Sequence, residues 1–328
     1  MKLRGIDFGY VMNASGARNF FGQGYPYHRW WRHFGLDYTG STFVAKTTTL
    51  DPRAGNMPLT DYTLQPIEVF PRCIETNIRK RAVLNAVGLS GPGADNLLKR
   101  NRWQERTDPF FISFAAVADT PQERIEQWKK FVELVEVRGY RRPHQPMFAA
   151  PIGLEVNLFC PNTGVADKPL MQEIMTTLDI ASDLKIPLVA KINALMPVEL
   201  ALKIQEHPAC DAICVSNTIL FGYLPGYIDW KNLWGNDVVS PLHQFGGGGL
   251  SGAPIFWLVV EWIENARKRG FYKPIVGCGG IMNSRDARIM LNAGVSAVQL
   301  GSVSIVRPWR VKNIIARTHA YAKEKYGA

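Results

Sequence analysis

The chain has 328 residues, of which 46% are hydrophobic and 20% charged, enough for one large globular domain. Its formal net charge is +10, but the basic residues are scattered and no nucleic-acid-binding motif accompanies them, so we expect no nucleic acid partner. Five cysteines without metal-type spacing, no apolar run of membrane-spanning length and no signal peptide indicate a cytoplasmic protein with free thiols, no metal and no integral membrane segment.

Eight apolar, β-branched runs recur along the chain, each followed by a cluster of Gly, Pro, Asn or Asp residues. They are almost continuously apolar rather than alternating, which is typical of parallel strands buried on both faces. In chain order the predicted strands occupy residues 10–15, 41–46, 110–116, 153–159, 186–192, 212–217, 274–279 and 297–302.

Amphipathic segments lie between several of these runs. Residues 120–139 are predicted to form a helix that opens at Thr120. Residues 284–294 are predicted to form a capped helix, with Ser284 at the N-cap and Gly294 at its end. Repeated alternation of strands and helices predicts an α/β fold in which helices cover a parallel sheet.

The number of repeats favours a (β/α)₈ TIM barrel with eight parallel strands, formed as a single domain by residues 1–328. Two stretches, residues 47–109 and 218–252, are long and irregular. We expect them to form long βα loops over the C-terminal face, where barrels carry function. The aromatic insertion at residues 227–234 is expected to be a surface loop that packs on the barrel or on a second subunit.

The C-terminal ends of barrel strands hold the active site in such folds. This chain places lysines, asparagines and one thiol there. They include no carboxylate pair, which argues against glycosidase chemistry, and no histidine, which leaves a Cys–His nucleophile unsupported. The residues concerned are Lys46, Asn157, Cys160, Asn162, Lys191 and Asn217.

Glycine-rich turns follow the last two predicted strands. Residues 276–287 (VGCGGIMNSRDA) place one such turn before a capped helix, and residues 300–302 (LGS) place another. The backbone of glycine allows N–H groups to approach an anion, and these two loops form the usual phosphate site of such barrels. A tight turn is the alternative for either run alone, but the pair favours phosphate.

The chain resembles the dihydroorotate dehydrogenase family of flavin-dependent barrels, in segments that keep the family's order over nearly the whole length. The matching segments are MNASG (12–16), VAKTTTLDPRAGN (44–56), NAVGLSGPG (85–93), LEVNLFCPNTG (154–164), VAKIN (189–193), VSNT (215–218), GGLSG (248–252), VGCGGIMNSRDA (276–287) and VQLGS (298–302).

The resemblance implies that the phosphate belongs to FMN. It places Lys191 beside the flavin N1 and C2 carbonyl, where a fixed cation offsets the negative charge of the reduced flavin. The implied FMN-binding residues are Ala14, Ser15, Gly16, Lys46, Thr47, Asn157, Lys191, Ser251, Gly252, Cys278, Gly279, Gly280, Gly301 and Ser302.

The resemblance also implies a pocket for a small planar pyrimidine with amide edges and one carboxylate. Asparagine suits such a ligand because its side chain offers both a donor and an acceptor. The implied substrate-binding residues are Lys46, Asn85, Gly88, Leu89, Asn157, Asn162, Asn217 and Thr218.

Three residues would be catalytic by this resemblance: Cys160, Lys191 and Lys46. The reaction would be the oxidation of (S)-dihydroorotate to orotate in de novo pyrimidine (UMP) synthesis. Cys160 would remove a proton from C5 while a hydride passes from C6 to flavin N5. A cysteine at this position, without an N-terminal helical extension, resembles the soluble class 1 members of the family.

The sequence leaves more than one possibility open for the electron acceptor and for the substrate. A homodimer that uses fumarate is the preferred expectation, while an iron–sulfur flavoprotein subunit that leads to NAD, or a quinone, is left open. The rival substrates are dihydropyrimidines of the uracil type, and a non-catalytic flavin-binding barrel is the rival of another class. Phe159 and the residues after Gly164 depart from the family's pattern in the segment that covers the substrate in that family.

Overall fold

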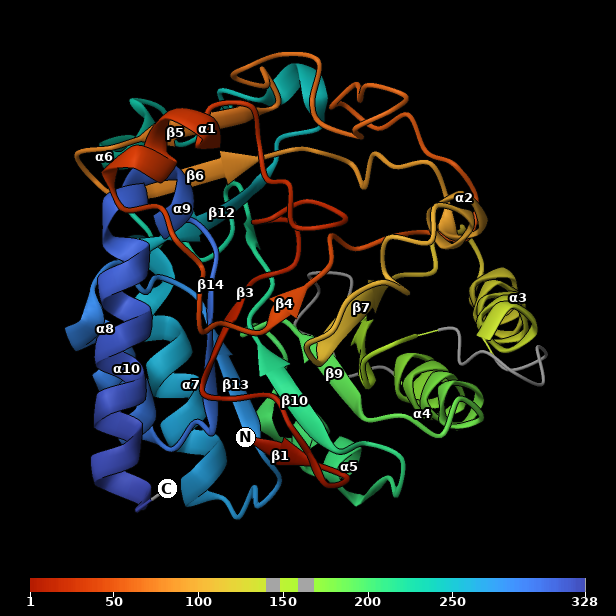
Figure 1. The fold of residues 1–328 in the computed structure, drawn as a ribbon. Coiled ribbons are helices and arrows are strands. Elements are labelled where there is room, and N and C mark those ends of the chain that lie inside the picture. The colour runs from red at the N-terminus through yellow and green to blue at the C-terminus, as the bar shows by residue number, and fades with distance from the viewer. Residues whose placement is uncertain (140–147, 159–167, 328) are drawn as a thin grey trace.

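The computed structural model describes residues 1–139, 148–158 and 168–327, and its centre is a barrel of eight parallel strands (Figure 1). Neighbouring strands pair in the order β3-β14-β13-β10-β9-β8-β7-β4. An isolated parallel bridge between Met12 and Thr42 joins the two ends of this order and closes the barrel. The strands are β3 (Val11–Asn13), β4 (Phe43–Val44), β7 (Phe110–Phe114), β8 (Ile152–Asn157), β9 (Leu188–Ile192), β10 (Ala212–Val215), β13 (Ile275–Cys278) and β14 (Ala297–Leu300).

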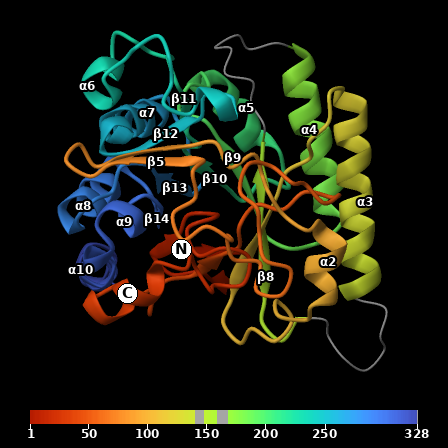
Figure 2. The ribbon, with the colours of Figure 1, turned by 90° about the horizontal axis from the view of Figure 1, so that it is seen from above.

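The predicted eight-stranded barrel is therefore confirmed, and each predicted run coincides with one of its strands, except that β8 begins one residue earlier, at Ile152. All but one residue of these strands are buried, because one face points into the barrel and the other meets the helical layer. Figure 2 shows that α3 and α4 cover one side of the barrel while α8 and α10 cover the opposite side. The helices outside the barrel strands are α1 (His28–Trp31), α2 (Ala94–Lys99), α3 (Pro121–Gly139), α4 (Lys168–Ser182), α5 (Val198–Glu206), α7 (Phe256–Lys268), α8 (Ser284–Ala293), α9 (Val303–Val306) and α10 (Val311–Tyr326).

The ends of two helices test the cap predictions. Helix α3 begins directly after Thr120, whose hydroxyl accepts a hydrogen bond from Glu123 N at 3.2 Å, as expected. Ser284 as the N-cap of α8 is wrong. The N-cap is Asn283, because its side chain accepts from Asp286 N at 3.2 Å while the Asp286 carboxylate accepts from Asn283 N at 3.1 Å. Gly294 ends the helix in the left-handed region, with φ 111°, as predicted.

The two long segments are more ordered than the sequence indicates. Together they form a four-stranded antiparallel sheet in the order β11-β12-β6-β5, which lies above the barrel strands (Figure 1). The expectation of long segments over the C-terminal face is therefore confirmed, but the strands within them were not predicted, because β6 pairs with β12 at positions more than 160 residues away in the chain. The strands are β5 (Ile74–Asn77), β6 (Ala82–Asn85), β11 (Ile219–Leu220) and β12 (Gly249–Gly252).

The aromatic insertion packs on this upper sheet. It contains the short helix α6 (Trp230–Trp234), and Trp230 is buried in a cluster with Leu84 and Leu250. The indole N–H of Trp230 donates to Tyr223 O at 2.9 Å. The insertion therefore packs against the upper sheet of its own chain and stabilises it.

The lower end of the barrel is closed by a short N-terminal hairpin of β1 (Lys2–Leu3) and β2 (Ile6–Asp7). Phe8, which follows the hairpin, packs inside the barrel, with its ring centroid 4.3 Å from that of Phe111. Access to the barrel interior is thus restricted to the upper end. Among the described residues, no helix combines the length and the apolarity that crossing a membrane would require.

Candidate active site

A cavity of about 680 Å³ lies between the C-terminal ends of the barrel strands and the upper sheet. Its volume is in the range of sites for small molecules and cofactors. Almost all the predicted site residues that the structure describes line it. These are Ala14, Ser15, Gly16, Lys46, Thr47, Asn85, Gly88, Leu89, Asn157, Lys191, Asn217, Thr218, Ser251, Cys278, Gly279, Gly280, Gly301 and Ser302.

Three predicted residues are not among those that the structure brings together. Gly252 does not line the cavity. Its φ is 101°, and a Cβ there would lie 2.3 Å from the carbonyl oxygen of Arg81. Glycine is therefore needed at this position for the backbone conformation and close packing of the upper sheet. Cys160 and Asn162 lie outside the described residues, as do Phe159 and Gly164. Their roles stay predictions from the sequence.

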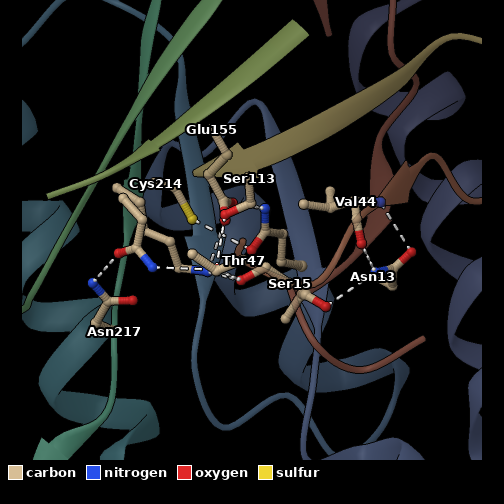
Figure 3. A network of polar contacts seen from close by, with 12 residues as sticks. Asn13, Ser15, Val44, Thr47, Ser113, Glu155, Cys214 and Asn217 are labelled. Atoms are coloured by element: carbon tan, nitrogen blue, oxygen red, sulfur yellow. Dashed lines mark hydrogen bonds and ion pairs between the residues drawn. The ribbon is translucent and has the colours of Figure 1, made fainter. Parts of the chain in front are cut away.

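The floor of the cavity carries a buried ion pair (Figure 3). Lys191 Nζ lies 3.3 Å from Glu155 Oε1, and the two side chains are only 5% and 1% exposed. The same ammonium donates to Ser15 Oγ at 3.4 Å. Burial by itself would lower the pKa of Lys191, but the Glu155 carboxylate together with Cys214 and Cys278 outweighs it and raises that pKa above its usual value. Lys191 is therefore a permanent cation beneath the cavity.

Glu155 is held by two further side chains. Its Oε1 accepts from Ser113 Oγ at 2.9 Å, and its Oε2 accepts from Gln299 Nε2 at 2.8 Å. The sequence predictions include none of Glu155, Ser113 and Gln299. Glu155 could have been predicted as a site residue, because a carboxylate inside an otherwise apolar strand such as β8 requires a buried partner.

A chain of hydroxyl and amide groups continues from the floor toward the rim (Figure 3). Thr47 Oγ1 lies 3.1 Å from Ser15 Oγ and 2.9 Å from Ser113 Oγ. Asn157 donates to Thr47 Oγ1 at 3.3 Å and accepts from Asn217 Nδ2 at 3.0 Å. These contacts join residues at the C-terminal ends of five barrel strands, β3, β4, β7, β8 and β10, so the polar groups that face the cavity are oriented before any ligand arrives.

Lys46 is the second lysine of the site, and its setting differs from that of Lys191. The side chain is 5% exposed, its ammonium donates to the carbonyl oxygen of Ser90, and it lies 4.7 Å from the centre of the Phe20 ring. Among the described residues it forms no ion pair with a carboxylate. Burial lowers the pKa of Lys46 to about 7, so the site holds a lysine that an anion would stabilise in its charged form.

This lysine predicts a pH dependence of stability. Above pH 7 the folded protein releases the Lys46 proton, whereas the unfolded chain keeps it up to its ordinary pKa of 10.5. The unfolded state therefore binds more protons, and the free energy of unfolding should rise by roughly 1 kcal/mol per pH unit between about pH 7 and 8.5 from this group. Urea unfolding of the flavin-free protein, compared with Lys46→Met, measures this contribution. Equal slopes in the two proteins would contradict it.

The glycine turns after β13 and β14 present backbone N–H groups to the cavity. Within the described part of the chain, the N–H groups of Gly279, Gly280 and Ser302 donate to no other backbone oxygen. A Cβ on Gly280 would lie 2.5 Å from Phe256 Cβ, so glycine lets this turn pass close to the start of α7. Ser302 Oγ donates to Ser251 Oγ at 2.7 Å. These donors fit the phosphate of a mononucleotide.

Two thiols lie beside the ion pair. Cys278 lines the cavity, and Cys214 approaches Gln299 Oε1 at 3.5 Å. Burial raises the pKa of Cys214 well above its usual value, whereas its hydrogen bond to Cys278 lowers the pKa of Cys278. The described part of the site thus combines a phosphate cradle, a fixed cation and a row of amides, which fits the phosphate, the ring and the edge of FMN.

Several known proteins of similar sequence are dihydroorotate dehydrogenases by name. The catalytic subunit of dihydroorotate dehydrogenase B (NAD(+)) from Endomicrobium trichonymphae is 29% identical over 290 residues, covering 86% of this chain and 80% of the relative. The corresponding subunit from Desulforamulus reducens is 28% identical over 323 residues, covering 96% and 90%. A putative dihydroorotate dehydrogenase A (fumarate) from Pediococcus pentosaceus is 28% identical over 316 residues, covering 93% and 88%.

The preference for fumarate as the acceptor conflicts with the NAD(+) in the names of the first two relatives, although the third carries fumarate in its name. The expected oxidoreductase acting on a CH–CH donor agrees with all three names. The sequence motifs alone could not distinguish these subgroups, because electron delivery depends on a surface or a partner rather than on the substrate pocket.

A solved structure supports the fold. The crystal structure of DHODH in complex with ferulenol from Eimeria tenella superimposes with a TM-score of 0.66 at 18% identity, covering 99% of this chain and 84% of that one. The model of the family described as dihydroorotate dehydrogenase matches residues 2–320. Together with the cavity at the strand ends, this match shows that the chain belongs to the dihydroorotate dehydrogenase family.

Proposed function

We propose that this chain uses FMN to oxidise (S)-dihydroorotate to orotate, a step of de novo pyrimidine nucleotide synthesis. The observation that carries the proposal is the buried Lys191–Glu155 pair, which lies beneath a cavity that also presents Asn85, Asn157 and Asn217. A carboxylate that forms a buried ion pair with a lysine is not available as a general acid or base, so the pair serves to keep a cation in place.

FMN, when bound, supplies the two-electron redox chemistry of the reaction. For this cofactor Lys191 provides a fixed positive charge, and Glu155 keeps that lysine charged and oriented. The backbone N–H groups of Gly279, Gly280 and Ser302 would hold the phosphate. The residues of this chain thus set the position and the charge environment of the ring.

The substrate's shape suits the remaining wall of the cavity. Asn85 Nδ2 donates to Gly249 O at 3.2 Å, and Asn157 and Asn217 are linked to each other at 3.0 Å. Each side chain keeps further donor or acceptor capacity for the amide edge of a pyrimidine. Lys46, which has no carboxylate partner among the described residues, supplies a cation for the carboxylate of dihydroorotate.

Cys160 is proposed as the base that removes the C5 proton. This role rests on the sequence and its resemblance, since the residue lies outside the described part of the chain. A thiol is suited to the task because its ordinary pKa of about 8.5 is close to neutral pH.

Lys46 favours dihydroorotate over the uracil-type alternative, because dihydrouracil has no carboxylate to pair with a buried lysine. The test is anaerobic reduction of the bound flavin by each compound. We expect dihydroorotate to bleach the flavin absorbance rapidly and dihydrouracil to leave it oxidised. If only dihydrouracil bleaches the flavin, the substrate is a dihydropyrimidine of the uracil type and not dihydroorotate. If neither compound bleaches it, the result supports a non-catalytic flavin-binding barrel.

For the electron acceptor we propose NAD⁺, reached through an electron-transfer subunit, as the names of the B-type relatives suggest. The isolated chain, once reduced by dihydroorotate, should then be reoxidised slowly by fumarate and by NAD⁺. Rapid reoxidation of the isolated chain by fumarate would instead assign it to the type named for fumarate.

A further inference from the structure

A second cavity, of about 740 Å³, lies on the outside of the barrel and shares no lining residue with the first. It lies between the segment around α1, the stretch that leads into β4, and the start of α10. Cationic side chains outnumber carboxylates in its lining. The charged lining residues, histidines aside, are Arg18, Arg32, Asp37, Arg106, Asp108 and Lys312.

The shortness of the first helix accounts for this cavity. Between β3 and β4 the chain forms only the four-residue α1 and a single 3₁₀ turn, Arg32–Phe34. Figure 1 shows α1 near the top of the molecule, well above β4. The outer side of β4 is therefore covered partly by arginines: the Phe43 ring lies 5.3 Å from the Arg18 guanidinium carbon and 4.2 Å from that of Arg106.

Within the described residues, the guanidinium groups of Arg18 and Arg106 form no ion pair and donate no hydrogen bond. Of their nitrogen atoms, Arg106 Nε is buried without an acceptor. Stacking on Phe43 uses the face of a guanidinium and leaves its in-plane donors free. An unsatisfied buried donor is costly, so an acceptor is expected here.

The carboxylates of the cavity do not supply that acceptor. Asp37 accepts from Thr39 N at 2.8 Å and lies 3.5 Å from Lys312 Nζ, so it is engaged elsewhere. Asp108 is exposed. Burial, with Arg18 as a further cause, lowers the pKa of Arg106 to about 10, although the charge of Asp108 acts in the opposite direction.

The two guanidinium groups converge on one point. Arg18 Nη2 lies 3.4 Å and Arg106 Nη1 3.8 Å from the position that a Cβ on Gly22 would occupy. Because residue 22 is glycine, the space between the two groups holds no side chain. A phosphate offers several acceptor oxygens in a tetrahedral arrangement, so it can accept hydrogen bonds from both guanidinium groups at once.

We propose that this cavity binds a phosphate group, free or carried by a small molecule, between Arg18 and Arg106. The volume exceeds what one phosphate fills, and Arg32 and Lys312 at the same cavity offer further positive charge. The proposal is independent of the dihydroorotate reaction, because no residue of this cavity lines the catalytic one.

The test uses the FMN-saturated protein, so that the cofactor's own phosphate site is already filled. Isothermal titration at constant ionic strength with inorganic phosphate, and then with ribose 5-phosphate, should show one saturable site. Arg18→Gln and Arg106→Gln should each weaken binding at least tenfold. Arg288→Gln is the matched control, because that arginine also stacks on a ring, Tyr321, but lines neither cavity.

The two probes identify the source of the phosphate. Tighter binding of ribose 5-phosphate indicates a phosphorylated small molecule, whereas equal or weaker binding indicates free phosphate. Arg18→Lys and Arg106→Lys keep the positive charge but lose the paired N–H donors of the guanidinium group. These lysine variants are used in place of the glutamine variants if the latter fail to fold. The proposal is overturned if wild type shows no saturable site, or if the Arg18 and Arg106 variants bind phosphate as wild type does.

Discussion

Glu155→Gln is expected to lower the free energy of unfolding of the flavin-free protein by about 3–5 kcal/mol at pH 7. The carboxylate is 1% exposed and lies 3.3 Å from Lys191 Nζ, so its loss leaves a buried ammonium without its counter-charge. The pKa of Lys191 is raised above its usual value in the folded protein, so the stabilisation by this pair is fully present at neutral pH and is lost only at strongly alkaline pH.

Urea unfolding followed by tryptophan fluorescence measures this effect, and a second ion pair provides the control. Glu173 lies 2.6 Å from Arg124, but both side chains are partly exposed to solvent. Glu173→Gln should therefore cost roughly 1 kcal/mol or less. Combining Glu155→Gln with Lys191→Met removes both buried charges and should recover much of the lost stability. If Glu155→Gln costs no more than Glu173→Gln, the pair does not have the role we assign to it.

Cys160→Ala should slow the reduction of bound flavin by dihydroorotate by about 10²–10⁴-fold, because the variant lacks the base that removes the C5 proton. The FMN content of the purified protein should stay the same, since the cofactor contacts we propose lie on other residues. Anaerobic stopped-flow absorbance measures the rate. Cys210→Ala is the control: that thiol is buried, donates to Ala212 O, and does not line the cavity.

The pH profile of the same reaction supplies a second measurement. The wild-type rate should increase as the Cys160 thiol ionises, with its midpoint near the ordinary thiol pKa of about 8.5. A flat profile from about pH 6 to 9, or a Cys160→Ala variant that reduces its flavin at nearly the wild-type rate, would remove Cys160 from the role of base.

Local sequence was sufficient wherever the physical cause is local. Continuous apolar runs predicted all eight barrel strands, because burial on both faces excludes polar side chains from most positions. Gly294 marked the end of α8, since the left-handed backbone there favours glycine. Many of the positions that line the cavity could also be predicted, because the carboxyl ends of parallel strands meet on one face of a barrel.

Local sequence was insufficient where two equivalent residues compete or where the partner lies far away in the chain. Asn283 and Ser284 are both good N-caps, and only the reciprocal hydrogen bonds with Asp286 decide between them. The antiparallel sheet over the barrel pairs β6 with β12, which the sequence separates by more than 160 residues. No local pattern reports such pairing.

The sequence by itself determined the barrel, its order of strands along the chain and many of the residues that line the cavity at the strand ends, because these follow from periodicity and from motifs at strand ends. Only the tertiary structure decided the electrostatics. It gave Lys191 a carboxylate and left Lys46 without one among the described residues, and it brought Arg18 and Arg106 together around Gly22. The charge state of a buried group depends on neighbours that the fold brings to it, and those neighbours are remote in the sequence.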